Sequence, residues 1–445
     1  MSFSEKFVGW AHYLLPSPFS IAVIITLFSI LLALLLTEPI VDGPIHLLQV
    51  LGHWEDGFFS LLSFTMQMIL ILVLGHVLAL SKPINLLIDR SLSFCNNTAS
   101  AAFLVTLFTV IMALFNWGLG LIFGAIFARK IGENMKKRGI AINYPLIGAA
   151  AYSGLMVWHG GLSGSAPADV AGKNHQLVDQ IGVLSNSATI FSTMNSVVSV
   201  VLLIVLPCLM YFLGKRALVA DYTVPSDPIL LDSEEKIQGA DRIDYSSIVC
   251  YLLSALFFVV IAMNLNEMGI RNFFTLNNII WSLFAFGFLF HGNFKRFIVA
   301  SERAIGGSTG ILIQFPLYAG IIGIMKGTGL LALFSDAFVS ISTATTFPFF
   351  AFLSAGLVNV FVPSGGGQWA VQGPIIVTAA QELGVPISKA IMALVYGDQL
   401  TNMLQPFWAL PLLGITGLKA KEILPYTFIL FLAGLVIFSL ALAVF

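Results

Sequence analysis

The sequence predicts an all-α polytopic membrane protein whose apolar helices are interrupted at four places by glycine, proline and polar side chains. Hydrophobic residues make up 58% of the 445 residues, charged residues make up 10%, and the mean hydropathy is +0.94. Soluble domains carry about 25% charged residues and do not contain many apolar runs of about 20 residues. The composition therefore excludes a soluble protein, and the lack of a basic block argues against nucleic-acid binding.

About nine full spans are expected, together with two shorter re-entrant hairpins. The hairpins, residues 98–135 and 343–381, break at their midpoints and are predicted to return to the side from which they enter. Seven spans are continuous apolar runs and two are broken by polar residues; the continuous runs lie near 18–37, 60–80, 188–213, 246–264, 276–291, 308–326 and 424–445, and the broken ones at 144–160 and 387–417.

The basic residues predict the orientation of these spans. With a cytoplasmic N-terminus and two returning hairpins, 17 of the 21 Lys and Arg residues lie on the cytoplasmic side. Such a bias is expected from the positive-inside rule. The first residues show no evident cleavage site, so we interpret them as a cytoplasmic lead-in and not as a signal peptide. The four outer basic residues are Lys173, Arg271, Lys326 and Lys389.

An internal repeat indicates an inverted architecture. A constant offset of 247 aligns 54 positions without a gap, and an offset of 244 continues the match further on. Five full crossings separate equivalent positions, so the second copy is predicted to be upside down, as in many secondary transporters. Matched pairs include Gln67 with Gln314, Asp89 with Asp336, Gly118 with Gly365, and Tyr152 with Tyr396.

Three parts of the chain follow from this repeat. Residues 1–213 form the first repeat and contain hairpin 98–135. Residues 214–245, which are polar and acidic, form a cytoplasmic linker. Residues 246–445 hold a connecting span and the second repeat with hairpin 343–381.

The stretch FVPSGGGQWAVQGP, residues 361–374, places helix-breaking residues where unpaired backbone groups cost several kcal/mol. Such backbone is tolerated only when it is buried in protein or lines a wet cavity. A helix that starts at Gly365 would direct free amides and a partial positive charge inward, and NWGLGLIFG (116–124) would do the same from the opposite face. Two such ends suit a small anion. The alternative is that these glycines serve only close helix packing.

A polar stripe is expected on the second broken helix. In YGDQLTNMLQPFW, four polar residues fall at i, i+3, i+4 and i+7 and therefore share a helix face: Asp398, Thr401, Asn402 and Gln405. Asp398 is the only carboxylate in a core segment, so it is a candidate to carry a proton or to help ligate Na⁺. The alternative is that Asp398 lies near the end of its span and is solvated.

The matching first-half stretch, YSGLMVWHGGLSGSAP, contains His159 and Ser163. A neutral imidazole can donate to a carboxylate, although an interfacial histidine bonded to backbone is an equally ordinary role. No Arg or Lys lies in the expected core, which favours a monoanion with a short apolar tail over a dicarboxylate. Four tryptophans flank the breaks and are candidates to wall the tail: Trp117, Trp158, Trp369 and Trp408.

Three motifs, FVPSGGGQWAVQGP, YGDQLTNMLQPFWALPLLGITGLKAKEI and NWGLGLIFGAIFARKIG, resemble those of the bacterial short-chain fatty acid transporter family, and the similarity runs over essentially the whole chain. The resemblance implies uptake of butyrate, acetoacetate or similar monocarboxylates across a bacterial inner membrane, driven by a H⁺ or Na⁺ gradient. It also implies a possible homodimer. By position, it places Na⁺ at Asn116, Gly118, Ser364, Gly365 and Thr401.

Together these arguments give two sets of candidate residues and no catalytic residue. The ion-coupling set is Asp398, Thr401 and Gln405. The substrate-binding set is Asn116, Gly118, Gly120, His159, Ser163, Ser364, Gly365, Gly366, Gly367, Gln368 and Asn402. The expected partners are a small monocarboxylate and membrane lipid, with no nucleic acid and no cofactor beyond the coupling ion. Two alternatives are a passive anion channel and an intramembrane serine protease that uses the G-x-S-G pattern at Ser163.

Overall fold

The computed structural model describes residues 16–39, 45–83, 94–173, 175–220, 222, 239–273 and 275–445, and the regular structure in these ranges is entirely helical. Within them, seven helices are long and apolar enough to cross a membrane. They are α2 (Pro18–Leu36), α4 (Leu62–Leu80), α6 (Thr98–Phe115), α11 (Thr193–Arg216), most of α12 (Ser247–Asn272), the run from α14 (Phe294–Ile305) to α15 (Thr309–Gly327), and α21 (Ala420–Val444).

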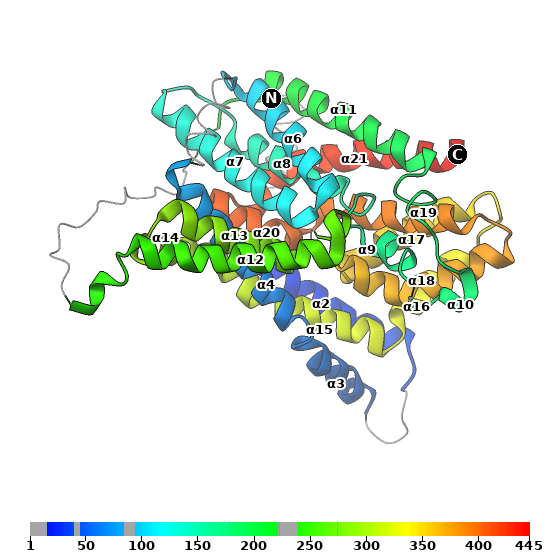
Figure 1. The fold of residues 1–445 in the computed structure, drawn as a ribbon. Helices are drawn as coiled ribbons and strands as arrows, with labels where there is room; N and C mark the ends of the chain where they lie inside the picture. Colours follow the sequence, from blue (N-terminus) through cyan, green and yellow to red (C-terminus); the bar gives the residue numbers. More distant parts are fainter. Residues whose placement is uncertain are drawn as a thin grey trace.

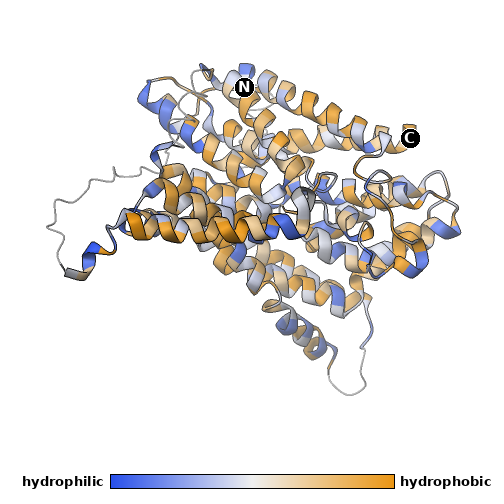
Figure 2. Cartoon of the chain, in the orientation of Figure 1, coloured by the Kyte–Doolittle hydropathy of each residue, from blue (hydrophilic) through white to orange (hydrophobic). Residues whose placement is uncertain are grey.

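These helices confirm an all-helical, multi-pass membrane protein. Six of the seven predicted continuous runs overlap one of the long helices, whereas 276–291 forms the shorter helix α13 (Leu276–His291). Hydrophobic residues cover most of the length of the long helices, and hydrophilic residues gather at helix ends and connections (Figure 2). Two sequence predictions fall partly outside the described residues. Asp89, the expected counterpart of Asp336, is one of them, and most of the predicted linker (221 and 223–238) is the other.

Two helical hairpins extend toward the centre of the molecule. In the first, α6 and α7 (Trp117–Lys137) meet at Asn116, which ends one helix and caps the next by accepting from the Leu119 amide at 3.0 Å. In the second, α17 (Phe347–Phe361) leads to α18 (Gly365–Glu382), which Ser364 caps by accepting from the Gly367 amide at 3.2 Å. The two hairpins approach from opposite sides of the molecule (Figure 1).

Two further helices are broken. The first consists of α8 (Tyr144–Tyr152), the 3₁₀ turn η1 (Ser153–Met156), an irregular loop and the short helix α9 (Ser165–Val170). The second consists of α19 (Ile387–Thr401), the 3₁₀ turn η4 (Asn402–Leu404) and α20 (Pro406–Thr416). The expectation that Asp398 and Gln405 share one helix face is therefore wrong, because α19 ends at Thr401 and Gln405 caps the next helix.

The peripheral helices pack reciprocally. Helices α2 and α3 (His46–Phe58) pack against α15, while α13 and α14 pack against α4. The helix bounds follow the offset found in the sequence: adding 247 to the bounds of α4 gives those of α15, and adding it to α3 gives α14 to within one residue. Glycines allow the closest of these contacts, since a Cβ on Gly57 of α3 would lie 2.7 Å from the Gly323 Cα of α15. Each half of the chain thus covers the other.

Candidate functional site

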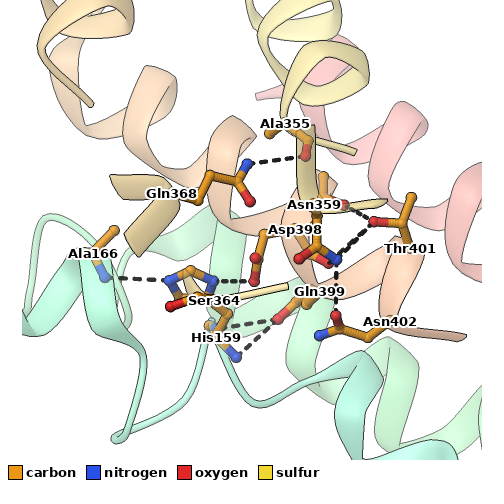
Figure 3. A network of polar contacts seen from close by, with 12 residues as sticks. His159, Ala166, Ala355, Asn359, Ser364, Gln368, Asp398, Gln399, Thr401 and Asn402 are labelled. Atoms are coloured by element: carbon orange, nitrogen blue, oxygen red, sulfur yellow. Dashed lines mark hydrogen bonds and ion pairs between the residues drawn. The ribbon is translucent and has the colours of Figure 1, made fainter. Parts of the chain in front are cut away.

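The centre of the molecule holds a buried pair formed by the two broken helices. Nδ1 of His159, in the loop after η1, lies 2.5 Å from Oδ2 of Asp398 on α19, and their side chains are 0% and 1% exposed (Figure 3). Asp398 is the only acidic side chain in the buried class among the described residues. It is therefore not a solvated residue near the end of its span, and His159 is not an interfacial histidine bonded only to backbone.

A backbone amide indicates the tautomer of His159. The Ala166 N–H donates to Nε2 of His159 at 3.2 Å. Because an N–H donates only to an unprotonated nitrogen, the proton of a neutral imidazole lies on Nδ1 and points at Asp398. The second oxygen of Asp398, Oδ1, has no hydrogen-bond partner among the described residues.

Each broken helix is hydrogen-bonded by side chains of the other. Gln399 Oε1 of α19 accepts from the amides of His159 and Gly160, both at 3.1 Å. The Tyr152 hydroxyl of α8 donates to the carbonyls of Asn402 and Gln405 at 2.8 and 2.9 Å. These bonds pair backbone groups that would otherwise be orphaned in an apolar interior.

A second polar cluster surrounds Asn359, near the C-terminal end of α17. Its Nδ2 donates to the Asp398 carbonyl (2.9 Å), to Thr401 Oγ1 (3.0 Å) and to Asn402 Oδ1 (2.8 Å). Gln405 Nε2 donates to the Asn359 carbonyl at 2.7 Å. The predicted polar residues of the second broken helix therefore gather around Asn359, although they do not lie on one helix face.

The turn of the second hairpin lies against this buried pair. A Cβ on Gly365 would lie 2.8 Å from Trp158 Cη2 and 2.9 Å from His159 Cε1, so the turn touches both rings. The first four amides of a helix lack intrahelical acceptors. Here the Ser364 hydroxyl accepts from the Gly367 amide, and the Ser364 carbonyl accepts from the Gln368 amide. The amides of Gly365 and Gly366 have no acceptor among the described residues.

One basic residue is buried and another lies beside the second turn. Nζ of Lys326, an exposed residue at the end of α15, would lie 3.7 Å from a Cβ on Gly367, which places an ammonium beside that turn. Arg129 of α7 is 3% exposed and contacts His76 and Glu133. The expectation that no Arg or Lys lies in the core is therefore wrong, and the argument against a dicarboxylate loses its basis.

The first hairpin turn is bonded more completely by the protein. Ser163 Oγ accepts from the Trp117 amide at 3.1 Å, and Asn116 accepts from the amides of Leu119 and Gly120. Of the first four amides of α7, only that of Gly118 then has no acceptor among the described residues. Gly120 itself packs closely on α6, because a Cβ there would lie 2.6 Å from the Ala113 Cβ.

Three of the four tryptophans form one aromatic cluster. The ring centroids of Trp117 lie 6.2 Å from Trp158 and 5.0 Å from Trp408, and Trp158 stacks on His159 at 4.5 Å. Trp369 points elsewhere, since its Nε1 donates to Asp169 at 2.7 Å. The cluster joins the first hairpin, both broken helices and the second hairpin turn.

The residues expected to hold Na⁺ come from both hairpin turns and from α19. Asn116 and Gly118 belong to the first turn, beside Ser163, and Ser364 and Gly365 form the second turn, at which Gly365 lies against His159. Thr401 bonds with Asn359 and with the carbonyls of its own helix.

The sequence analysis missed three amides of the site: Asn195, Asn359 and Gln399. Asn195 Nδ2 donates to the Gly160 carbonyl at 2.8 Å, and Tyr396 donates to Asn195 Oδ1 at 3.1 Å. The signal in the sequence is a single amide within a long apolar run, as in LVNVF around Asn359.

Comparisons with known proteins agree over the whole chain. The family profile described as "Short chain fatty acid transporter" matches residues 2–445. The "Putative short-chain fatty acid transporter" of Escherichia coli (strain K12) is 37% identical over 453 residues, which cover 100% of this chain and 98% of that protein. The chain belongs to the short-chain fatty acid transporter family.

A protein of the same description from Haemophilus influenzae is 34% identical over 442 residues, which cover 96% of each chain. Among solved structures, the chain is similar to Neisseria gonorrhoeae MtrF, described as illuminating a class of antimetabolite efflux pumps. That likeness has a TM-score of 0.39 and 15% identity, covering 98% of this chain and 97% of the other. This member of the short-chain fatty acid transporter family is thus a multi-pass membrane protein and not an enzyme.

Two neighbouring glycines of this family member provide a matched test of the geometry. Gly365→Ala should lower the melting temperature, because the buried His159 ring cannot move away from the new methyl group and overpacking costs about 1–3 kcal/mol. Gly366→Ala should leave it nearly unchanged, since the nearest atom to a Cβ there, in Ser165, is 3.8 Å away. Equal melting curves of the two purified variants would contradict the close contact between Gly365 and His159.

Proposed function

We propose that this protein is an ion-coupled secondary transporter that moves short-chain monocarboxylates, such as butyrate or acetoacetate, across a bacterial inner membrane by alternating access. The observation that supports it best is the meeting of both broken helices and the second hairpin turn at one buried pair, His159 and Asp398. Substrate and ion sites of secondary transporters lie at such discontinuous helices. Family membership supports the substrate class.

The proposed architecture has about nine full spans, two re-entrant hairpins and inverted repeats in 1–213 and 246–445, with a cytoplasmic N-terminus. The shared offset of helix bounds and the reciprocal packing of α3 on α15 and α14 on α4 support the repeat. The opposite approach of the two hairpins supports the inversion (Figure 1). Hairpins of this kind are candidates to move against the packed helices of the opposite repeat.

The proposed substrate site is the second hairpin turn. The amides of Gly365 and Gly366 and the ammonium of Lys326 supply donors and positive charge for one carboxylate. The cluster of Trp117, Trp158 and Trp408 supplies an apolar wall for a short tail. Further substrate-binding candidates are Asn116, Gly118, Gly120, His159, Ser163, Ser364, Gly367, Gln368 and Asn402.

The proposed coupling residue is Asp398, with Thr401 and Gln405 nearby. A buried carboxylate is costly unless positive charge compensates it, and one neutral histidine supplies a hydrogen bond but no charge. Binding of a coupling cation at Asp398 would remove a negative charge beside the substrate site, because only the His159 ring separates Asp398 from Gly365.

A serine protease requires a base at Ser163, which the site does not offer. Both ring nitrogens of His159 are bonded, to Asp398 and to the Ala166 amide, and Ser163 Oγ accepts from the Trp117 amide. A passive anion channel is the other alternative, and it differs from a carrier in its kinetics.

Counterflow in proteoliposomes tests the proposed function. Vesicles loaded with unlabelled butyrate should take up labelled butyrate transiently above equilibrium, which a carrier does and a channel does not. Acetoacetate should compete. Flux that does not saturate with substrate would favour the channel, and lack of counterflow with both acids would reject the proposal.

Asp398→Asn should abolish accumulation of butyrate against its gradient, because an amide cannot hold the charge of the coupling ion, while exchange of labelled for unlabelled butyrate continues. The matched control is Asp179→Asn, which removes an exposed carboxylate in the helix α10 (Val178–Ile181) and should leave accumulation unchanged. Accumulation of labelled butyrate is measured for both variants under an imposed proton gradient and, separately, under an imposed sodium gradient. Full accumulation by Asp398→Asn would remove Asp398 from the coupling role.

Lys326→Met should raise the butyrate concentration for half-maximal counterflow roughly 10- to 100-fold, since a hydrogen bond to a charged group contributes about 1.5–3 kcal/mol. Lys173→Met is the control, because it removes another exposed lysine, in the loop after α9. An unchanged half-saturation in Lys326→Met would show that Lys326 does not contact the substrate.

A further inference from the structure

Around the buried carboxylate, four side-chain oxygens have no hydrogen-bond donor among the described residues, and Asn402 Nδ2 is a donor there without an acceptor. The four oxygens are Asp398 Oδ1, Asn359 Oδ1, Gln368 Oε1 and Gln405 Oε1. All four residues are at most 4% exposed. Buried polar atoms are nearly always paired, so a group of unpaired acceptors points to a ligand that brings positive charge or donors.

The hydrogen bonds that the side-chain nitrogens donate show which way the amide groups of Asn359, Gln368 and Gln405 are turned. Asn359 Nδ2 has three acceptors, as described above. Gln368 Nε2 donates to the Ala355 carbonyl at 2.9 Å and to Gln372 Oε1 at 2.8 Å. Gln405 Nε2 donates to the carbonyls of Asn359 and Val360 at 2.7 and 2.9 Å. Turning any of these amides would set an oxygen against carbonyl oxygens, so the free atoms are oxygens.

Three of these side chains meet at one face of α17, to which Asn359 itself belongs. Gln368 of α18 donates to the carbonyl of Ala355, and Ala355 lies one helical turn before Asn359 on α17. Gly397 packs α19 so closely on the same face that a Cβ there would lie 2.8 Å from the Ala355 Cβ, which brings in Asp398. Figure 3 shows the side chains of Gln368 and Asn359 on either side of Asp398.

The Asp398 carboxylate supplies the negative charge for a cation. Helices α17 and α19 end beside this cluster, at Phe361 and Thr401, and their C-termini add partial negative charge, whereas the N-termini of α18 and α20, which begin at Gly365 and Pro406, oppose it. The Asp398 carboxylate adds a full charge. A single proton on Oδ1 would serve Asp398 and one acceptor and leave the others unpaired, whereas a metal ion binds several oxygens together.

We propose that Asp398 Oδ1, Asn359 Oδ1 and Gln368 Oε1 bind Na⁺, with Gln405 Oε1 at the edge of the site. One carboxylate with neutral amide oxygens matches the charge of a monovalent ion, and oxygen ligands suit a hard cation. This set differs from the residues to which the family resemblance assigned Na⁺. The inference rests on the proposed function, because it names the coupling ion of that transporter and its ligands.

The site gives a physical route for coupling. Na⁺ neutralises Asp398, whose Oδ2 is bonded to His159, and the His159 ring contacts Gly365 of the substrate turn. Bound Na⁺ therefore removes repulsion between Asp398 and a substrate carboxylate. By linkage, butyrate should raise the affinity for Na⁺ by the factor with which Na⁺ raises the affinity for butyrate, typically about 5- to 150-fold.

Thermal unfolding of the purified full chain in detergent tests the site without transport. Sodium chloride is titrated against choline chloride at constant ionic strength. Na⁺ should raise the melting temperature and saturate, since a ligand that binds only the folded state stabilises it. Butyrate should lower the Na⁺ concentration at the midpoint.

Substitutions identify the ligands in the same titration. Gln368→Met, which keeps the shape but removes the oxygen, should raise the Na⁺ midpoint about tenfold or more, that is by about 1.4 kcal/mol. Gln368→Glu, which keeps an oxygen there, should still bind, and Asp398→Asn should lose the Na⁺ effect. Gln381→Met is the matched control, because it removes an exposed glutamine from the same helix.

Three outcomes would overturn the site: no difference between Na⁺ and choline for the unmodified protein, an unchanged midpoint in both Gln368→Met and Asp398→Asn, or full accumulation of butyrate under a proton gradient without Na⁺. The last would assign Asp398 to a proton. Each leaves counterflow of butyrate intact, so failure of the Na⁺ site is distinguishable from failure of the proposed function.

Discussion

The central constraint on this molecule is that a helix broken within an apolar interior must find partners for its backbone inside the protein. The chain meets this constraint by exchange between its two broken helices. Gln399 accepts from the amides of the first break, and Tyr152 donates to the carbonyls of the second. Because each break is satisfied in part by the other broken helix, the two depend on each other, and the exchange holds His159 beside Asp398.

The interruptions of the helices place hydrogen-bond donors on one side of His159 and acceptors on the other. The start of α18 presents amides of Gly365 and Gly366, whereas the ends of α17 and α19 present carbonyl and carboxylate oxygens. The His159 ring lies between them. In the proposed mechanism, an anion and a cation would therefore bind at distinct places within a few residues of each other, and occupancy of one would change the electrostatic energy of the other.

Much of the helical framework was predictable because hydropathy in a membrane protein is a strong signal. The sequence also selected His159 and Asp398 as candidates, and the structure shows that they touch. Their partners were not predictable, because Asn359 and Gln399 are ordinary amides in apolar runs. The packing of α17 on α19 gives Asn359 its role, and the meeting of the two broken helices gives Gln399 its role. Helix periodicity placed Gln405 with Asp398, but the 3₁₀ turn η4 breaks that register. Lys326 was assigned to the outer side because it ends an apolar run, whereas the three-dimensional fold places its ammonium beside Gly367.

The reciprocal packing of α3 on α15 and of α14 on α4 has a consequence for biosynthesis. The glycine surface of α3 meets its partner only after about 250 further residues have left the ribosome, since Gly57 contacts Gly323. Contacts so distant along the chain are slow to form, and larger proteins fold through intermediates with exposed surface. The first half is therefore expected to be inserted in the bilayer without its packing partner until the second half has been synthesised.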